Sequence, residues 1–103
     1  MNNKERSREH YKKNKLRYLL RNIKSRCENV NDRCYNVYGG KGVKCLITLD
    51  ELKELWVRDR ANKLNWASID RKDPDGNYEY SNCRFIEMSD NAKKEHLKYY
   101  KKL

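Results

Sequence analysis

The chain has 103 residues, a length that fits one small domain with a single hydrophobic core. Lysine and arginine number 25 against 15 aspartate and glutamate residues, so the formal net charge is +10. Such an excess favours a polyanionic partner, and nucleic acid is the first candidate. The apolar runs are too short to span a membrane and no secretory signal precedes them, so we expect a protein of the reducing cytoplasm.

The N-terminal half predicts an arm followed by a helix. Residues 1–15 are polar and mostly basic without an apolar stripe, so we expect a flexible basic arm, followed by a single domain over residues 16–103. From Leu16 onward the apolar residues recur at helical spacing, with arginine and lysine on the other faces. Those charges form either a solvated face or a contact surface for a polyanion.

Two further elements are expected before the centre of the chain. Gly39, Gly40 and Gly42 predict a tight loop beside a short strand. Thr48 followed by Glu51 forms a capping box, which predicts a helix that ends near residue 61. Its buried stripe comprises Leu49, Leu52, Leu55 and Trp56.

The C-terminal third predicts a hairpin and a helix. Residues 66–69 form a short apolar run into Asp70, residues 73–77 have strong turn chemistry, and residues 83–86 supply the returning strand. Ser89 is a suitable N-cap for a last helix toward residue 100. The expected fold class is α+β, with the hairpin packed on the last helix and two additional N-terminal helices completing the core.

This hairpin presents polar side chains suited to phosphodiester hydrolysis. A divalent ion held by few protein ligands can do most of that chemistry, and magnesium prefers oxygen ligands. Asp70 at a strand end and Asn91 on the following helix could supply those oxygens to Mg²⁺ or Mn²⁺. Asn82, at the start of the second strand, could hold the loop through its backbone.

The segment DRKDPDGNYEYSNCRF, with YGGKGV some thirty residues before it, resembles the phage and mobile-element branch of the HNH endonucleases. These homing-endonuclease-like enzymes are also called ββα-metal or His-Me finger nucleases, and close relatives show YGGRGI, DRID, DGNY and ENCRW. The resemblance covers roughly residues 26–94. It implies a small ββα-metal core at about residues 66–100, and a phage-encoded protein acting in a bacterial host cell.

The resemblance also implies roles, although the position of the usual base histidine holds no histidine here. In one alignment register Asp70 is the metal ligand and Arg71 replaces the histidine; in the other Asp70 itself replaces it. Both registers place Asn82 on the central asparagine and Asn91 on the metal ligand of the helix. Arg71 or Arg84 would neutralise the scissile phosphate.

Two functions follow as the main hypotheses. The first is a metal-dependent endonuclease or nickase of double-stranded DNA, with Asp70, Arg71 and Asn82 as catalytic residues and Asp70 and Asn91 as metal ligands. The alternative is a DNA-binding protein of the same fold with weak or no catalysis. A third reading, action on a host protein, has no support beyond size. The basic residues expected to contact DNA are Lys12, Lys13, Arg17, Arg21, Lys24, Lys41, Arg84, Lys93 and Lys94.

The four cysteines are not spaced like a zinc site. Zinc ribbons and knuckles use short C-x-x-C pairs, and Cys27, Cys34, Cys45 and Cys83 contain no close pair. We therefore expect small buried residues rather than structural zinc ligands.

Overall fold

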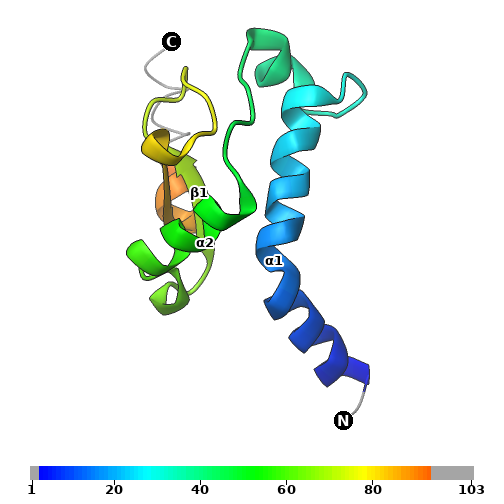
Figure 1. Cartoon of the computed structure of the whole chain (residues 1–103), viewed down its shortest axis with the longest axis vertical. Helices are drawn as coiled ribbons and strands as arrows, with labels where there is room; N and C mark the ends of the chain where they lie inside the picture. Colours follow the sequence, from blue (N-terminus) through cyan, green and yellow to red (C-terminus); the bar gives the residue numbers. More distant parts are fainter. Residues whose placement is uncertain (1–2, 94–103) are drawn as a thin grey trace.

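A computed structural model of the chain describes residues 3–93, and in this range the fold is α+β, as expected from the sequence. A long helix stands along one side, and a short helix with a two-stranded hairpin forms the other (Figure 1). The helices and strands are α1 (Asn3–Glu28), α2 (Leu49–Arg58), β1 (Ala67–Arg71) and β2 (Cys83–Glu87). Single 3₁₀ turns lie at η1 (Tyr35–Val37), η2 (Gly39–Lys41), η3 (Ala61–Lys63) and η4 (Tyr80–Asn82), and residues 88–93 are helical. None of the described helices is long and apolar enough to cross a membrane.

The predicted hairpin is present, with β1 and β2 paired antiparallel from Ala67 opposite Glu87 to Arg71 opposite Cys83. Side chains alternate between the two faces of a strand. One face of β2 therefore carries the buried Cys83 and Phe85, while Arg84 between them is exposed. The same alternation places Asp70 and Arg71 of β1 on opposite faces.

Helix α2 confirms the predicted capping box. The Thr48 hydroxyl accepts from the Glu51 N–H at 3.2 Å, and the Glu51 carboxylate accepts from the Thr48 N–H at 3.0 Å. The helix ends at Arg58, three residues before the predicted end. Arg60 adopts a left-handed conformation with a φ of 51°, and a residue in this conformation interrupts the α-helix.

Three element boundaries differ from those expected. Helix α1 begins at Asn3 rather than at Leu16, because residues 3–15 contain strong helix formers and no glycine or proline to end the helix. The expected short strand near the glycines is a single parallel bridge between Cys45 and Tyr78. The last helix starts at residue 88, so Ser89 lies inside it rather than at its N-cap.

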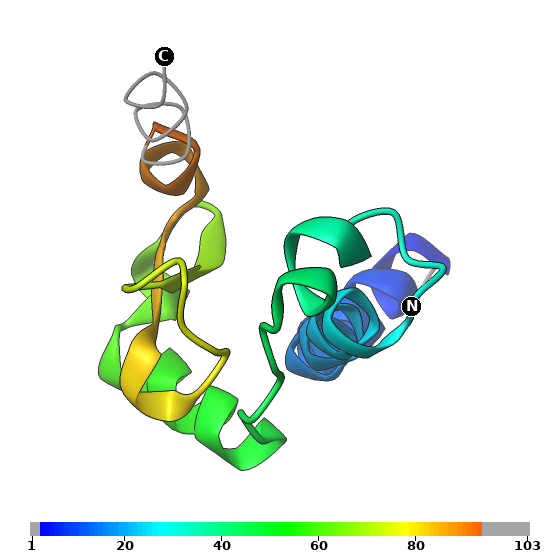
Figure 2. The same cartoon turned by 90° about the horizontal axis from the view of Figure 1, so that it is seen from above.

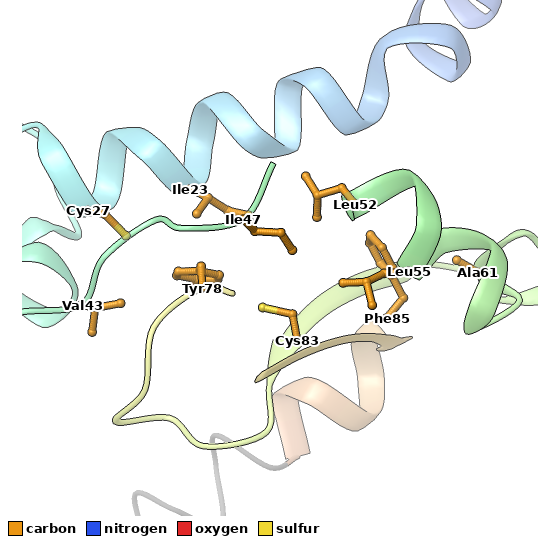
Figure 3. Packing of buried hydrophobic residues seen from close by; sticks show 10 residues of the cluster. All are labelled: Ile23, Cys27, Val43, Ile47, Leu52, Leu55, Ala61, Tyr78, Cys83 and Phe85. Carbon is orange, nitrogen blue, oxygen red and sulfur yellow. The ribbon is translucent and has the colours of Figure 1, made fainter. Parts of the chain in front are cut away.

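The hydrophobic core joins the two sides of the molecule (Figure 3). Ile23 and Cys27 project from α1, Leu52 and Leu55 from α2, and Cys83 and Phe85 from β2, with Ile47 and Tyr78 between them. Ile23, Leu52, Leu55 and Cys83 are fully buried. Each large aliphatic side chain buried in this way contributes about 2 kcal/mol relative to exposure. Helix α1 is thereby fixed against α2 and the segment that precedes it.

Two glycines meet conformational demands of the turn after α1. Gly42 ends η2 with a φ of 89°, a left-handed conformation that disfavours residues with a Cβ. Gly39 has a different role, since a Cβ there would overlap the carbonyl oxygen of Cys27 and the ring of Tyr35. The absence of a side chain at Gly39 lets η2 lie directly against the end of α1.

We predict that Gly39→Ala destabilises the protein by about 2 kcal/mol or more, because backbone atoms of α1 must move to admit the methyl group. Gly40→Ala is the matched control, since its Cβ would approach Tyr35 O at 3.1 Å, a contact that needs only a small shift. Urea unfolding of both variants measures the difference. Equal stabilities would show that η2 does not depend on this close approach.

Candidate functional site

A cleft of about 1050 Å³ separates α1 from the hairpin side of the molecule. Seen from above, the two sides form a V that is joined at its base by α2 and the segment before it (Figure 2). All five residues of β1 line the cleft, so the strand presents its unpaired edge to it. The charged side chains among the lining residues are Lys15, Arg26, Asp70 and Arg71.

Asp70 is buried and held by an ion pair. Its side chain is 3% exposed, and its Oδ2 accepts from Arg84 Nε at 2.9 Å across the hairpin. The Arg84 side chain is 44% exposed, so one partner is shielded from water and the other is partly exposed to it. A buried carboxylate is stable in this position because a cation and hydrogen bonds compensate its lost hydration.

Asn91 is attached to the same strand from the helical segment 88–93. Its Nδ2 donates to Ser68 Oγ at 2.9 Å and to the Ile69 carbonyl at 3.1 Å. This anchors the amide nitrogen on β1 and directs Oδ1 away from those two partners. Asp70 and Asn91, the two residues expected from the sequence as metal ligands, both line the cleft.

The donor set of Asp70 and Asn91 fits a hydrated magnesium ion, which prefers oxygen ligands and retains several waters. A carboxylate and an amide oxygen are a sufficient protein share for such an ion. For the ion to bind Asp70 Oδ2, Arg84 would have to give up its hydrogen bond to that oxygen. The described residues contain no group of three or more histidine, cysteine, aspartate or glutamate side chains arranged for a metal. Any metal site here therefore rests on few protein ligands.

Asn82 organises the loop between the strands, as predicted. Its Oδ1 accepts from the Asp73 N–H at 2.9 Å, and its Nδ2 donates to the carbonyls of Asp73 and Asn77 at 3.0 Å. The Asn82 backbone carbonyl accepts from Lys72 N at 2.7 Å. With all its amide groups engaged by the loop, Asn82 acts here as a positioning residue.

Arg71 lies against aromatic rings on the other face of β1. Its guanidinium carbon is 4.9 Å from the Tyr78 ring centroid and 5.1 Å from that of Tyr38, and its Nη1 donates to the Gly76 carbonyl at 2.8 Å. A guanidinium remains protonated at all ordinary pH values, so Arg71 cannot take a proton as the missing histidine would. Its chemistry is that of a fixed positive charge.

Arg26 of α1 approaches the same rings. Its guanidinium carbon is 5.2 Å from the Tyr38 ring centroid, and its Nη1 donates to the Tyr78 hydroxyl at 3.2 Å. Burial raises the pKa of Tyr78 to about 12, although Arg26 acts in the opposite direction. The phenol is therefore neutral at physiological pH and can accept this hydrogen bond.

The basic residues expected to bind DNA are not gathered in the cleft. Arg17, Arg21 and Lys24 lie on the face of α1 that its helical period turns away from the cleft-lining residues. Lys41 and Lys93 are exposed outside the lining, and Arg84 is engaged by Asp70. The side chains of Lys12 and Lys13 and the whole of Lys94 lie outside the described part of the chain.

Lys15 and Arg26 were missed as candidate site residues. Lys15 Nζ lies 3.7 Å from the centroid of the Trp56 ring, and both basic residues line the cleft. Residues 15, 19, 22 and 26 lie on one face of the helix, so their spacing indicates that Lys15 and Arg26 point in the same direction. The sequence alone did not show which face of α1 meets the hairpin.

The cysteines behave as core residues or surface thiols. Burial raises the pKa of Cys27 and of Cys83 to about 11, so both thiols are neutral at physiological pH. Cys34 is exposed and Cys45 partly buried. Neutral buried thiols contribute apolar contacts to the core.

Comparison of the chain with protein-family models, with curated proteins and with solved structures gives no match.

We predict that Asn82→Ala lowers the free energy of unfolding by about 2 kcal/mol, because one N–H and two carbonyls of the loop lose their partner. Asn36→Ala, at an exposed asparagine in η1, is the control and should change stability by less than about 0.5 kcal/mol. Thermal and urea unfolding measure both. If Asn82→Ala leaves the free energy of unfolding unchanged, the loop does not depend on the Asn82 side chain for its conformation.

Proposed function

We propose that the protein is an HNH-like DNA-binding protein that holds duplex DNA against the cleft between α1 and the hairpin. The observation that carries the proposal is the net positive charge of the cleft lining. The lining has three cations, Lys15, Arg26 and Arg71, and one carboxylate. That carboxylate, Asp70, is already paired with Arg84. A cleft whose lining is net positive concentrates the positive electrostatic potential of a protein whose net charge is +10.

Aromatic side chains support these cations. Lys15 lies over Trp56, and Arg26 and Arg71 lie near Tyr38. A cation over an aromatic face is stabilised in position while keeping its full positive charge. The resemblance of the hairpin sequence to HNH endonucleases supports the same class of partner.

We predict that the protein binds a fluorescent 20-base-pair duplex with strong salt dependence. About seven neutralised phosphates would give a log-log slope of about −6. Lys15→Gln should weaken binding and reduce this slope by about one. Lys53→Gln, at an exposed lysine of α2 outside the cleft lining, should leave both unchanged within error. A salt-independent response of the wild type would remove the nucleic-acid proposal.

A second candidate function is hydrolysis of the bound DNA at Asp70 and Asn91. Their shared attachment to β1 at the edge of the cleft favours it. A divalent ion bound there would supply a Lewis acid for a phosphoryl oxygen and a water molecule. Arg84, released from Asp70, would neutralise the phosphate, while Asn82 keeps the adjacent loop in place. Without a histidine base, we expect slow nicking rather than rapid cleavage.

We predict that supercoiled plasmid is slowly relaxed in Mg²⁺ or Mn²⁺ and that EDTA abolishes the activity. Asp70→Asn and Asn91→Ala should each lower the rate at least 100-fold while retaining DNA binding. Asn62→Ala, a substitution in the cleft lining outside the metal site, controls for general loss of structure. If the wild type does not nick plasmid at any pH from 6 to 9.5, the hydrolase candidate is rejected and the binding proposal stands on its own test.

A further inference from the structure

Arg26 and Arg71 both reach the ring of Tyr38 although they come from distant parts of the chain. One projects from α1 and the other ends β1, yet both guanidinium carbons lie within 5.2 Å of the Tyr38 ring centroid. Tyr38 and Tyr78 have ring centroids 6.1 Å apart and form a common support. All four residues line the cleft.

Like charges repel, so two arginines are held together only where the surrounding structure compensates. The contacts that offset the repulsion here include those with the Tyr78 hydroxyl, the Gly76 carbonyl and the two rings. No carboxylate of the described residues forms an ion pair with Arg26, which is partly buried. Two guanidinium groups at one aromatic support in a half-buried setting are electrostatically suited to an anion.

We infer that Arg26 and Arg71 together bind a single backbone phosphate of the DNA, at a subsite distinct from the Asp70 and Asn91 centre. This inference deepens the proposed function and rests on it for the identity of the ligand.

The chemistry favours a phosphate over other anions. The guanidinium group is planar and presents a fork of N–H donors that matches phosphate oxygens. Two forks can share one phosphate because its tetrahedral oxygens point in different directions. A neutral Tyr78 beside them adds no competing negative charge.

The position separates this subsite from the scissile centre. Strand alternation places Arg71 with Ile69 on one face of β1 and Asp70 with Ser68 on the other. Asn91 bonds to the Ser68 hydroxyl, on the Asp70 side. The phosphate bound by the arginine pair is therefore a neighbour of the scissile phosphate rather than the scissile phosphate itself.

The first experiment is a double-mutant cycle on duplex binding by the full chain. Arg26→Gln and Arg71→Gln should each weaken binding about tenfold at 100 mM salt. Because either loss breaks the shared subsite, the double variant should be little weaker than the worse single variant. Fully multiplicative losses would mean separate phosphates and would overturn the inference. Arg21→Gln, on the opposite face of α1, is the charge-matched control and should have a smaller effect.

The second experiment tests the subsite without DNA. Titration with inorganic phosphate, followed by NMR of the arginine Nε–H groups, should shift the Arg26 and Arg71 signals together and leave Arg21 unaffected. Mononucleotide should act in the same way, whereas chloride at equal ionic strength should not. If the wild type fails to bind duplex but these signals respond, the DNA proposal fails and the anion site remains. No selective shift would overturn the inference.

A third variant separates anion binding from folding. Arg26→Lys keeps the charge and can still donate to Tyr78, but it lacks the planar fork. We expect near-wild-type thermal stability, with duplex affinity between those of the wild type and Arg26→Gln. If Arg26→Lys binds duplex as weakly as Arg26→Gln while remaining folded, the fork geometry is essential. Binding of Arg26→Gln equal to that of the wild type would contradict the inference.

Discussion

Tyr78 joins the two sides of the molecule. Its residue is 4% exposed, its backbone exchanges hydrogen bonds with Lys44 and Leu46, and its hydroxyl accepts from Arg26 of α1. A buried phenol needs a hydrogen-bond partner, and here that partner is also a cation of the cleft. The hairpin loop, the segment before α2 and α1 therefore meet at one residue. The position of Arg26, one of the cations of the cleft, depends in part on this contact.

The Asp70–Arg84 ion pair is the second constraint on the site. Asp70 is buried and Arg84 is partly exposed, so separating the pair costs Asp70 more free energy than it costs Arg84. If Arg84 moves toward a phosphate, it remains hydrated or becomes paired again, whereas the buried charge of Asp70 loses this ion pair. A divalent ion would offset that charge. Under the proposed function, binding of DNA and binding of metal would therefore favour one another at this pair.

Local sequence signals predicted the elements that depend on local chemistry. The Thr48–Glu51 capping box, the antiparallel strands and the loop contacts of Asn82 all follow from residues close in the sequence. The start of α1 did not, because helix propensity continues through a segment that has no apolar stripe. The meeting of Arg26 and Arg71 at the Tyr38 ring depends on which face of α1 is turned toward the rest of the molecule. That face is set by the burial of Ile23 and Cys27, contacts between distant parts of the chain.

The two faces of β1 carry different groups. Asp70 lies on the face where Asn91 bonds to the Ser68 hydroxyl, and Arg71 lies on the face that carries the tyrosine support. Successive side chains of a strand point to opposite faces, so neighbouring residues such as Asp70 and Arg71 lie on different surfaces. A strand of only five residues can therefore contribute side chains to both faces. A substitution on the Asp70 face need not change the contacts that Arg71 and Arg26 make with the tyrosines. Under the proposed function, DNA binding and hydrolysis would therefore depend on different side chains, and a chain of this design would keep its affinity for DNA even without hydrolysis.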